Sequence, residues 1–337
     1  MVSERGLEVL KVIVQDYVAS REPVGSKSIV ERHTFGVSAA TIRNDMALLE
    51  DEDLIVAPHT SSGRVPTDKG YRLFVDQLAD LRPLTAAQRQ AIDRFLGESV
   101  DLEDVLARTV RLLSQLTRQV AIVQYPSLAS AKVRHIELVP LSSTKLMTVF
   151  IVDTGGVEQR VLEVQPLDDD FVAELRARLN SALVGLPLAD AARTLDGFAS
   201  LFPVDRQPIV EPVVAAILEQ LLANRQDKLV MAGAATLARS EQDFSIYPVL
   251  EAIEEQVTLL RLIGEMQIDG GVVAASIGRE NAVFGLAEAS VLTSGYTASG
   301  GSLGRLGVLG PTRMDYSSNM VAVRAVARYL TRHLGEP

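Results

Sequence analysis

The spacing of apolar residues changes three times along this chain of 337 residues, and these changes limit the folds that it can adopt. Apolar side chains first recur every three or four residues, which indicates helices with one buried face. Runs typical of strands begin near residue 121, helical spacing returns at about 168–225, and strands resume near 271. This order predicts an α+β multidomain protein in which a largely helical block interrupts a sheet.

The individual strands and domain boundaries follow from the same pattern. Residues 153–156 are a hairpin signal between two of the strands. Strands are predicted at 54–58, 64–66, 121–123, 136–139, 146–152, 161–164, 271–277, 283–286 and 306–309. We therefore expect a first domain at 1–80, linker helices at 81–119, a sheet domain in two segments at 120–165 and 246–337, and an inserted domain at 166–245.

Composition excludes several classes of site. The chain contains no cysteine and four histidines that are far apart, so disulfides, thiolate zinc sites and cysteine nucleophiles are excluded and we expect no metal or cofactor. No apolar run approaches the roughly 20 residues that a membrane span needs. The N-terminus has no basic segment followed by an apolar one, and we expect a cytoplasmic protein.

The first domain has the pattern of a helix-turn-helix. A core helix near the N-terminus is followed by a short helix that Ser26 can cap, a turn, and a third helix that begins after Ser38. The first turns of this third helix combine small residues with Thr41, Arg43 and Asn44. Arginine can pair with guanine and asparagine with adenine in the major groove. The alternative for this segment alone is an ordinary capped helix.

A polar loop between two short strands follows the third helix and predicts a β wing. Glycine and serine at a wing tip let backbone amides approach phosphates, and Arg64 beside the tip can enter a minor groove or hold the DNA backbone. The alternative is a solvated hairpin with a chance arginine. The residues predicted to contact DNA are Lys27, Ser38, Thr41, Arg43, Asn44, Thr60, Ser61, Ser62, Arg64, Lys69 and Arg72.

The charge of the chain argues against tight binding by one copy. The net charge is −10, although phosphate contacts usually supply much of the affinity for DNA. Residues 1–82 contain ten Lys and Arg against thirteen Asp and Glu, a net charge of −3. Four consecutive acids at 50–53 lie outside the proposed contact residues. We therefore expect weak non-specific binding and a need for dimerisation.

Motifs at both ends of the chain resemble the HrcA family of heat-inducible transcription repressors. They are Pro23 to Lys27, Ser38 to Met46, Pro58 to Arg72, Ile277 to Asn281 and Gly307 to Tyr316. The resemblance implies a winged helix, a GAF-like domain and an inserted dimerising domain. It also implies a homodimer on an inverted-repeat operator of chaperone operons, kept active by a GroEL-type chaperonin.

Two other hypotheses are open at this point. A small ligand in the GAF-like domain could control the repressor, because such folds often contain effector pockets. An enzyme would need a site, but the glycines of Gly300 to Gly307 precede a predicted strand without the lysine of a phosphate-binding loop. The scattered carboxylates form no pair. We therefore expect a protein that is not an enzyme.

Overall fold

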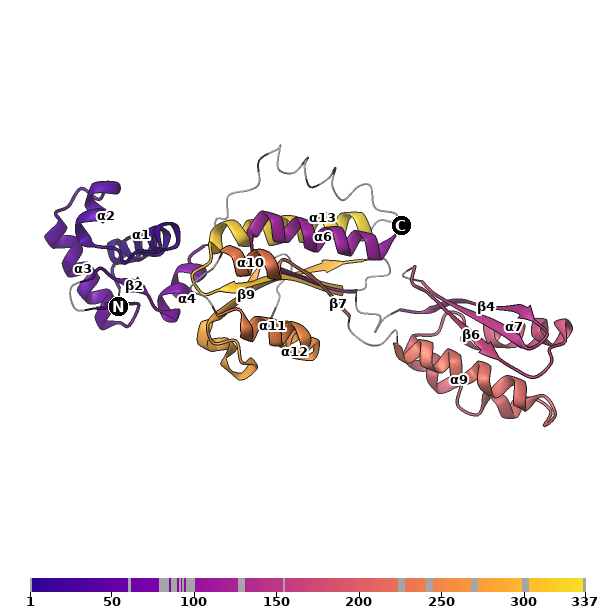
Figure 1. Cartoon of the computed structure of the whole chain (residues 1–337). Helices are drawn as coiled ribbons and strands as arrows, with labels where there is room; N and C mark the ends of the chain where they lie inside the picture. The colour runs from indigo at the N-terminus through magenta and orange to yellow at the C-terminus, as the bar shows by residue number, and fades with distance from the viewer. Residues whose placement is uncertain are drawn as a thin grey trace.

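The computed structural model describes residues 2–59, 62–78, 85, 90, 92, 94, 101–126, 131–153, 155–223, 228–240, 245–267, 272–298 and 303–335. These residues form three parts that lie in a row (Figure 1): an N-terminal unit, a body with a five-stranded sheet, and a unit with a three-stranded sheet. The protein is thus a mixed α+β protein, as the sequence predicts. No described helix combines the length and the apolar character that crossing a membrane requires.

The N-terminal unit consists of helices around a small hairpin. Its elements, in order, are α1 (Glu4–Ser20), α2 (Ser26–Arg32), α3 (Ala39–Asp51), β1 (Ile55–Val56), β2 (Val65–Pro66) and α4 (Asp68–Asp76). The side chains of Ser3, Ser38 and Thr67 accept hydrogen bonds from backbone amides and cap α1, α3 and α4. The helices and the hairpin lie where the sequence predicts them.

The body is an antiparallel sheet between two layers of helices. The strand order is β7 (Leu229–Ala232), β3 (Val120–Gln124), β10 (Leu303–Pro311), β9 (Ala289–Thr297) and β8 (Ala274–Ile277). One layer contains α6 (Leu102–Thr117) and α13 (Tyr316–Gly335); the other contains α10 (Ala234–Ser240), α11 (Tyr247–Glu254) and α12 (Gln256–Glu265). Alternate residues of β3 bury their side chains in different layers, because successive side chains of a strand point to opposite faces.

The third part has its own sheet and its own core. Strands β4 (Val133–Ser142), β5 (Lys145–Val152) and β6 (Val157–Glu163) pair in that order. Helices α7 (Asp169–Leu183), α8 (Leu188–Thr194) and α9 (Gln207–Ala223), with the short η2 (Phe198–Leu201), complete it. Inward side chains such as Ile136, Leu146 and Phe150 are fully buried against these helices. This core is separate from that of the body.

The observed sheets differ from the expected domain boundaries. Strands β4 to β6 were expected in the same sheet as β3, but they pair only with one another among the described residues. The chain returns to the body at β7, which pairs with β3. The interruption therefore spans about 131–223 instead of 166–245, and it contains strands. Helix α6 packs on β3 and α13, so the expected linker segment contributes to the body.

The local structure differs from the sequence analysis in two further places. Residues 283–286 were predicted as a strand, but 283 and 284 end the 3-10 helix η3 (Gly278–Phe284) and the next two residues follow it. Strand β9 was not predicted. Its residues are buried almost continuously, because helices cover both faces of the sheet, and such a strand lacks the alternation that marks a half-exposed one.

Candidate nucleic-acid interface

Helix α3 presents one polar and one apolar side. Ile42, Met46 and Leu49 are buried in the core of the N-terminal unit, whereas Arg43 and Asn44 are exposed. Neither exposed side chain has a hydrogen bond or ion pair with any described residue, and both can therefore reach a ligand without breaking a contact. Ala40, Ala47 and Leu48 are exposed on the same helix.

The start of α3 is fixed by its cap. The Ser38 Oγ accepts a hydrogen bond from the Thr41 backbone amide at 3.3 Å and lies 3.1 Å from Thr41 Oγ1. Ser38 is exposed and Thr41 half-buried. The two predicted contact residues therefore lie together at the N-terminal end of the helix, where the partial positive charge of the helix favours an anion such as phosphate.

An ion pair between a buried aspartate and an exposed arginine holds the opposite side of α3, and the sequence interpretation missed it. Asp45 is 5% exposed and accepts two hydrogen bonds from Arg5 of α1, Nε to Oδ2 at 2.7 Å and Nη2 to Oδ1 at 3.1 Å. The pair fixes how α3 rotates on α1. The signal in the sequence is an acid among the apolar positions of one helix face, between Ile42 and Leu49, because buried charges are usually paired.

The hairpin after α3 is short and tightly folded. The Ser62 hydroxyl donates to the His59 carbonyl at 2.7 Å and accepts from the His59 amide at 3.0 Å, so this side chain stabilises the turn. A Cβ atom on Gly63 would lie 2.5 Å from backbone atoms of Val24, and only glycine fits there. Thr60 and Ser61, also predicted to contact DNA, lie outside the described residues.

Two predicted DNA contacts are bound to the C-terminal end of α3. The Arg64 guanidinium lies 2.9 Å from Glu50 Oε2, and its backbone pairs with Val24 at 2.8 and 2.9 Å. Lys69 Nζ donates to the Glu52 carbonyl at 2.7 Å, where the negative end of the helix favours a cation. Both cations therefore stabilise the packing of the hairpin and α4 on α3. Lys27 is exposed on α2, and its side chain forms no hydrogen bond or ion pair with a described residue.

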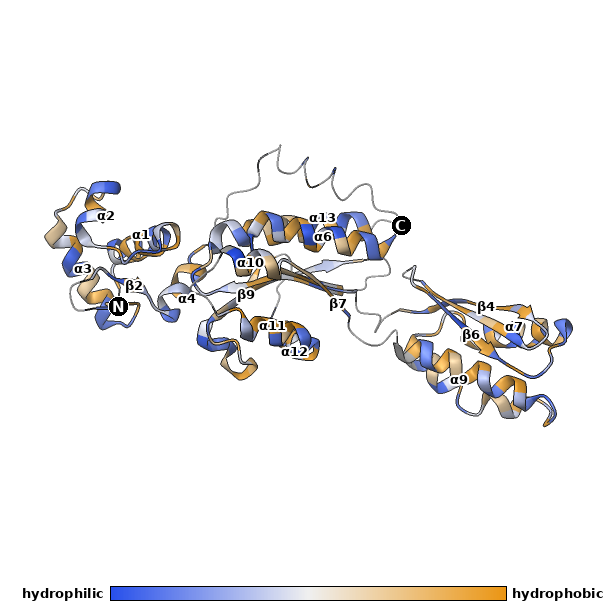
Figure 2. Cartoon of the chain, in the orientation of Figure 1, coloured by the Kyte–Doolittle hydropathy of each residue, from blue (hydrophilic) through white to orange (hydrophobic). Residues whose placement is uncertain are grey.

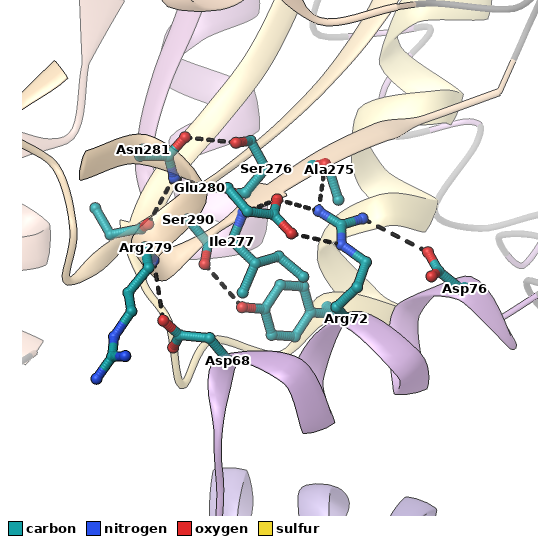
Figure 3. A network of polar contacts seen from close by, with 12 residues as sticks. Asp68, Arg72, Asp76, Ala275, Ser276, Ile277, Arg279, Glu280, Asn281 and Ser290 are labelled. Atoms are coloured by element: carbon teal, nitrogen blue, oxygen red, sulfur yellow. Dashed lines mark hydrogen bonds and ion pairs between the residues drawn. The ribbon is translucent and has the colours of Figure 1, made fainter. Parts of the chain in front are cut away.

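The structure places Arg72 away from the surface of α3. Its guanidinium donates to both carboxylate oxygens of Glu280, with Nε at 2.8 Å from Oε1, and to the Ala275 carbonyl at 2.8 Å (Figure 3). A guanidinium bound to the body in this way would have to leave Glu280 to reach a phosphate, and the predicted DNA contact of Arg72 stays a prediction. The contact with Glu280 spans 208 positions of the sequence, and local patterns cannot predict it.

The charges near α3 are divided along the helix. Arg43, Asn44 and the Ser38 cap belong to its N-terminal half, whereas the acids at 50–53 are at its end. A helix of 13 residues is about 20 Å long at roughly 1.5 Å per residue. Arg64 and Lys69 bind at the acidic end, which reduces repulsion of a nearby polyanion. Among the described residues, no group of three or more His, Asp or Glu is placed to hold a metal ion.

Comparisons with known proteins identify the family. A family model described as "HrcA protein C terminal domain" matches residues 103–320. The chain is 69% identical over 339 residues to the heat-inducible transcription repressor HrcA of Clavibacter michiganensis subsp. michiganensis, and the match covers 100% of both chains. The chain belongs to the HrcA family. The HrcA proteins of Leifsonia xyli and Streptomyces albus are 64% and 52% identical over 339 residues, again with 100% of both chains covered.

Membership in the HrcA family confirms the resemblance found in the sequence. The chain is a heat-inducible transcription repressor by homology, and a repressor of transcription acts on DNA. A crystal structure at 2.2 Å resolution, described as that of a hypothetical protein, aligns with a TM-score of 0.66, covers 99% of both chains and is 24% identical. That likeness supports the overall fold.

Proposed function

We propose that the N-terminal unit is a winged helix-turn-helix domain and that α3 is its recognition helix. The observation behind this proposal is that Arg43 and Asn44 are exposed, and bind no other described side chain, on a helix whose other side is buried. In this arrangement α3 enters a major groove, and its first turns lie against base edges. Ser38, Thr41 and Lys27 contact phosphates or bases, and the hairpin tip at 60–62 approaches the DNA backbone.

The roles of the other predicted contact residues are narrower in this proposal. Arg64 and Lys69 fix the wing and α4 relative to α3, because their side chains are bound within the protein. Arg72 connects the N-terminal unit to the body. We also propose that the body is the GAF-like domain, in segments of about 101–126 and 228–335, and that residues 131–223 form the inserted dimerising domain.

The inserted sheet supports the proposal of a homodimer. One face of β4 to β6 is covered by helices, and the opposite face has no helix on it among the described residues. The register places Met147 beside Val161 and Ile151 beside Val157 on this bare face, and Figure 2 shows hydrophobic and hydrophilic residues mixed along the strands of this unit. Val157 and Val161 are 60% and 55% exposed. We propose that a second copy covers this face, since apolar patches of this kind mark interfaces.

Dimerisation connects the inserted domain to DNA recognition. Two copies related by a twofold axis present two recognition helices to two half-sites, and the operator is therefore an inverted repeat. The family resemblance further supports chaperone operons as targets and a GroEL-type chaperonin as the partner that keeps the repressor active in the cytoplasm. Unfolded clients would occupy that chaperonin during heat shock and release repression.

Footprinting of the full-length protein on the DNA upstream of its own gene tests this function. We expect protection of two half-sites related by a twofold axis, and stronger protection when a GroEL-type chaperonin and ATP are added. The variant Arg43→Ala should lose the protection, whereas Arg328→Ala, which removes one exposed charge from α13 of the body, should keep it. Protection of a single site without symmetry would contradict the dimeric arrangement.

A further inference from the structure

Helix α4 is the element of the N-terminal unit that meets the body. Its apolar side chains belong to a core cluster that contains residues of both parts. Tyr71 of α4 packs against Tyr316 of α13 with ring centroids 5.5 Å apart, and the two side chains are 3% and 1% exposed. The buried residues of the N-terminal unit and of the α6–α13 layer form one continuous cluster. The N-terminal unit is therefore docked on the body in the described structure.

Two polar side chains of α4, one turn apart, reach residues 277–281, which comprise the end of β8 and the first residues of η3 and are called the receiving loop below (Figure 3). The Asp68 carboxylate accepts a hydrogen bond from the Arg279 amide at 2.9 Å. Arg72 binds both oxygens of the Glu280 carboxylate and the Ala275 carbonyl. The contact thus combines a bidentate guanidinium–carboxylate pair, the geometry that gives direction as well as energy, with a backbone hydrogen bond.

The receiving loop is itself rigid. Glu280 Oε2 accepts a hydrogen bond from the Ile277 amide at 2.8 Å, which fixes the carboxylate that Arg72 binds. Asn281 is fully buried and donates to the Ser276 carbonyl at 3.2 Å and to the Ala289 carbonyl of β9 at 2.8 Å. The loop is therefore bonded to the central sheet as well as to α4.

Gly278 lets the two elements approach closely. Its φ is +53°, and an added Cβ atom would lie 2.4 Å from the Asp68 carboxylate. A side chain at this position would displace Asp68, and the left-handed conformation disfavours one as well. The motif at 277–281, which the winged helix does not use for DNA, is thus shaped to receive α4.

We propose that Asp68, Arg72 and the loop at 277–281 form a latch that fixes the orientation of each recognition helix relative to the body. This inference rests on the proposed dimeric, DNA-binding function. An inverted repeat requires two recognition helices at a set separation, about 34–36 Å for half-sites one helical turn apart. The second half-site adds affinity only if the geometry lets both helices bind together. Asp68 and Arg72 are therefore positioning residues for operator binding.

Charge reversal and its repair test the latch on DNA. We would measure the DNA affinity of Arg72→Glu, Glu280→Arg and the double variant by fluorescence anisotropy. Three duplexes are compared: the footprinted inverted repeat, a single half-site, and the repeat with one or two base pairs added at its centre. Each single variant should lose roughly tenfold in affinity for the repeat, keep its half-site affinity within about twofold, and become less sensitive to the added base pairs. The double variant should recover part of this loss, because the exchange restores the guanidinium–carboxylate pair but not the hydrogen bonds with the Ala275 carbonyl and the Ile277 amide.

A measurement without DNA separates the latch from the proposed function. Because the chain has no cysteine, spin labels can be attached at Glu31→Cys on α2 and Gln256→Cys on α12, both exposed, in protein diluted with unlabelled chain. The unchanged latch should give one narrow distance distribution. Arg72→Glu should broaden it, and the double variant should narrow it again in part. If the unchanged protein fails to bind the repeat but gives this result, the proposed function is wrong and the latch stands.

Gly278→Ala provides a second route, because it displaces Asp68 without changing a charge. It should broaden the distance distribution and reduce discrimination between spacings in the same way. Two results would overturn the latch. The first is that the distance distributions and the dependence on added base pairs stay unchanged in the single variants and in Gly278→Ala. The second is an equal loss of affinity for the half-site and the repeat, which would indicate damage within the N-terminal unit.

Discussion

The guanidinium of Arg64 lies 2.9 Å from the carboxylate of Glu50, and this ion pair ties the β1–β2 hairpin to the last turn of α3. Arg64 and Glu50 are 27% and 35% exposed, so the pair is partly shielded from water. The geometry makes Arg64 a brace between the hairpin and α3, whereas its residue type alone suggests a DNA contact.

The salt dependence of binding distinguishes these two roles. We expect Arg64→Ala to weaken operator binding while leaving the slope of log K against log salt unchanged, because a brace releases no counterion. Lys27→Ala should make this negative slope shallower by about 0.9, the value for one lost phosphate contact. Titrations at several salt concentrations measure both slopes. A shallower slope for Arg64→Ala would show that the guanidinium of Arg64 leaves Glu50 and binds phosphate in the unchanged protein.

Substitution of the exposed pair on α3 should change which sequence is bound. We expect Arg43→Ala and Asn44→Ala each to cost about 1–3 kcal/mol of binding free energy on the operator and to relax the preference at one base pair. Competition with operators altered at single positions measures this preference. Arg328→Ala on the body is the matched loss of one positive charge. A uniform loss across all sequences would assign these residues to phosphate contacts.

A charge on the bare sheet face should prevent dimerisation. Val161→Glu would place a carboxylate in the proposed interface, where an unpaired buried charge is costly. We expect a monomer by sedimentation velocity at concentrations at which the unchanged chain is a dimer, together with loss of operator binding but retention of half-site binding. Val184→Glu, at a 46% exposed position after α7 in the same unit, is the control. A persistent dimer would move the interface elsewhere.

The two tyrosines between α4 and α13 should respond differently to loss of their hydroxyl groups. The Tyr316 hydroxyl donates to the Thr312 carbonyl at 2.6 Å and lies 2.8 Å from Ser290 Oγ, whereas the buried Tyr71 hydroxyl has no partner among the described atoms. Burial raises the pKa of both phenols above their usual range, so both remain neutral.

We expect Tyr316→Phe to lower the free energy of unfolding by about 1 kcal/mol, the value for a typical hydrogen bond. Tyr71→Phe should leave it unchanged or raise it, because an unsatisfied buried hydroxyl opposes folding. Urea unfolding monitored by circular dichroism measures both. Destabilisation of similar size in the two variants would show that the Tyr71 hydroxyl has a partner in solution.

The sequence by itself determined the local structure of the N-terminal unit. Ser38 caps a helix where it was expected to, and the polar loop before Arg64 joins two short strands. These features depend on side chains and backbone groups a few residues apart, and their patterns are therefore visible in a single chain. The exposed pair Arg43 and Asn44 follows from helical periodicity in the same way.

Only the tertiary structure decided which strands share a sheet and which cations face solvent. Strands β4 to β6 have the strand pattern expected of the body but pair among themselves, since pairing depends on packing between distant segments. Arg72 has the residue type of a phosphate contact, yet Glu280, 208 positions away, binds it. Periodicity and capping reflect neighbours along the chain, whereas the partner of a strand or a charge is chosen by the packing of the complete fold.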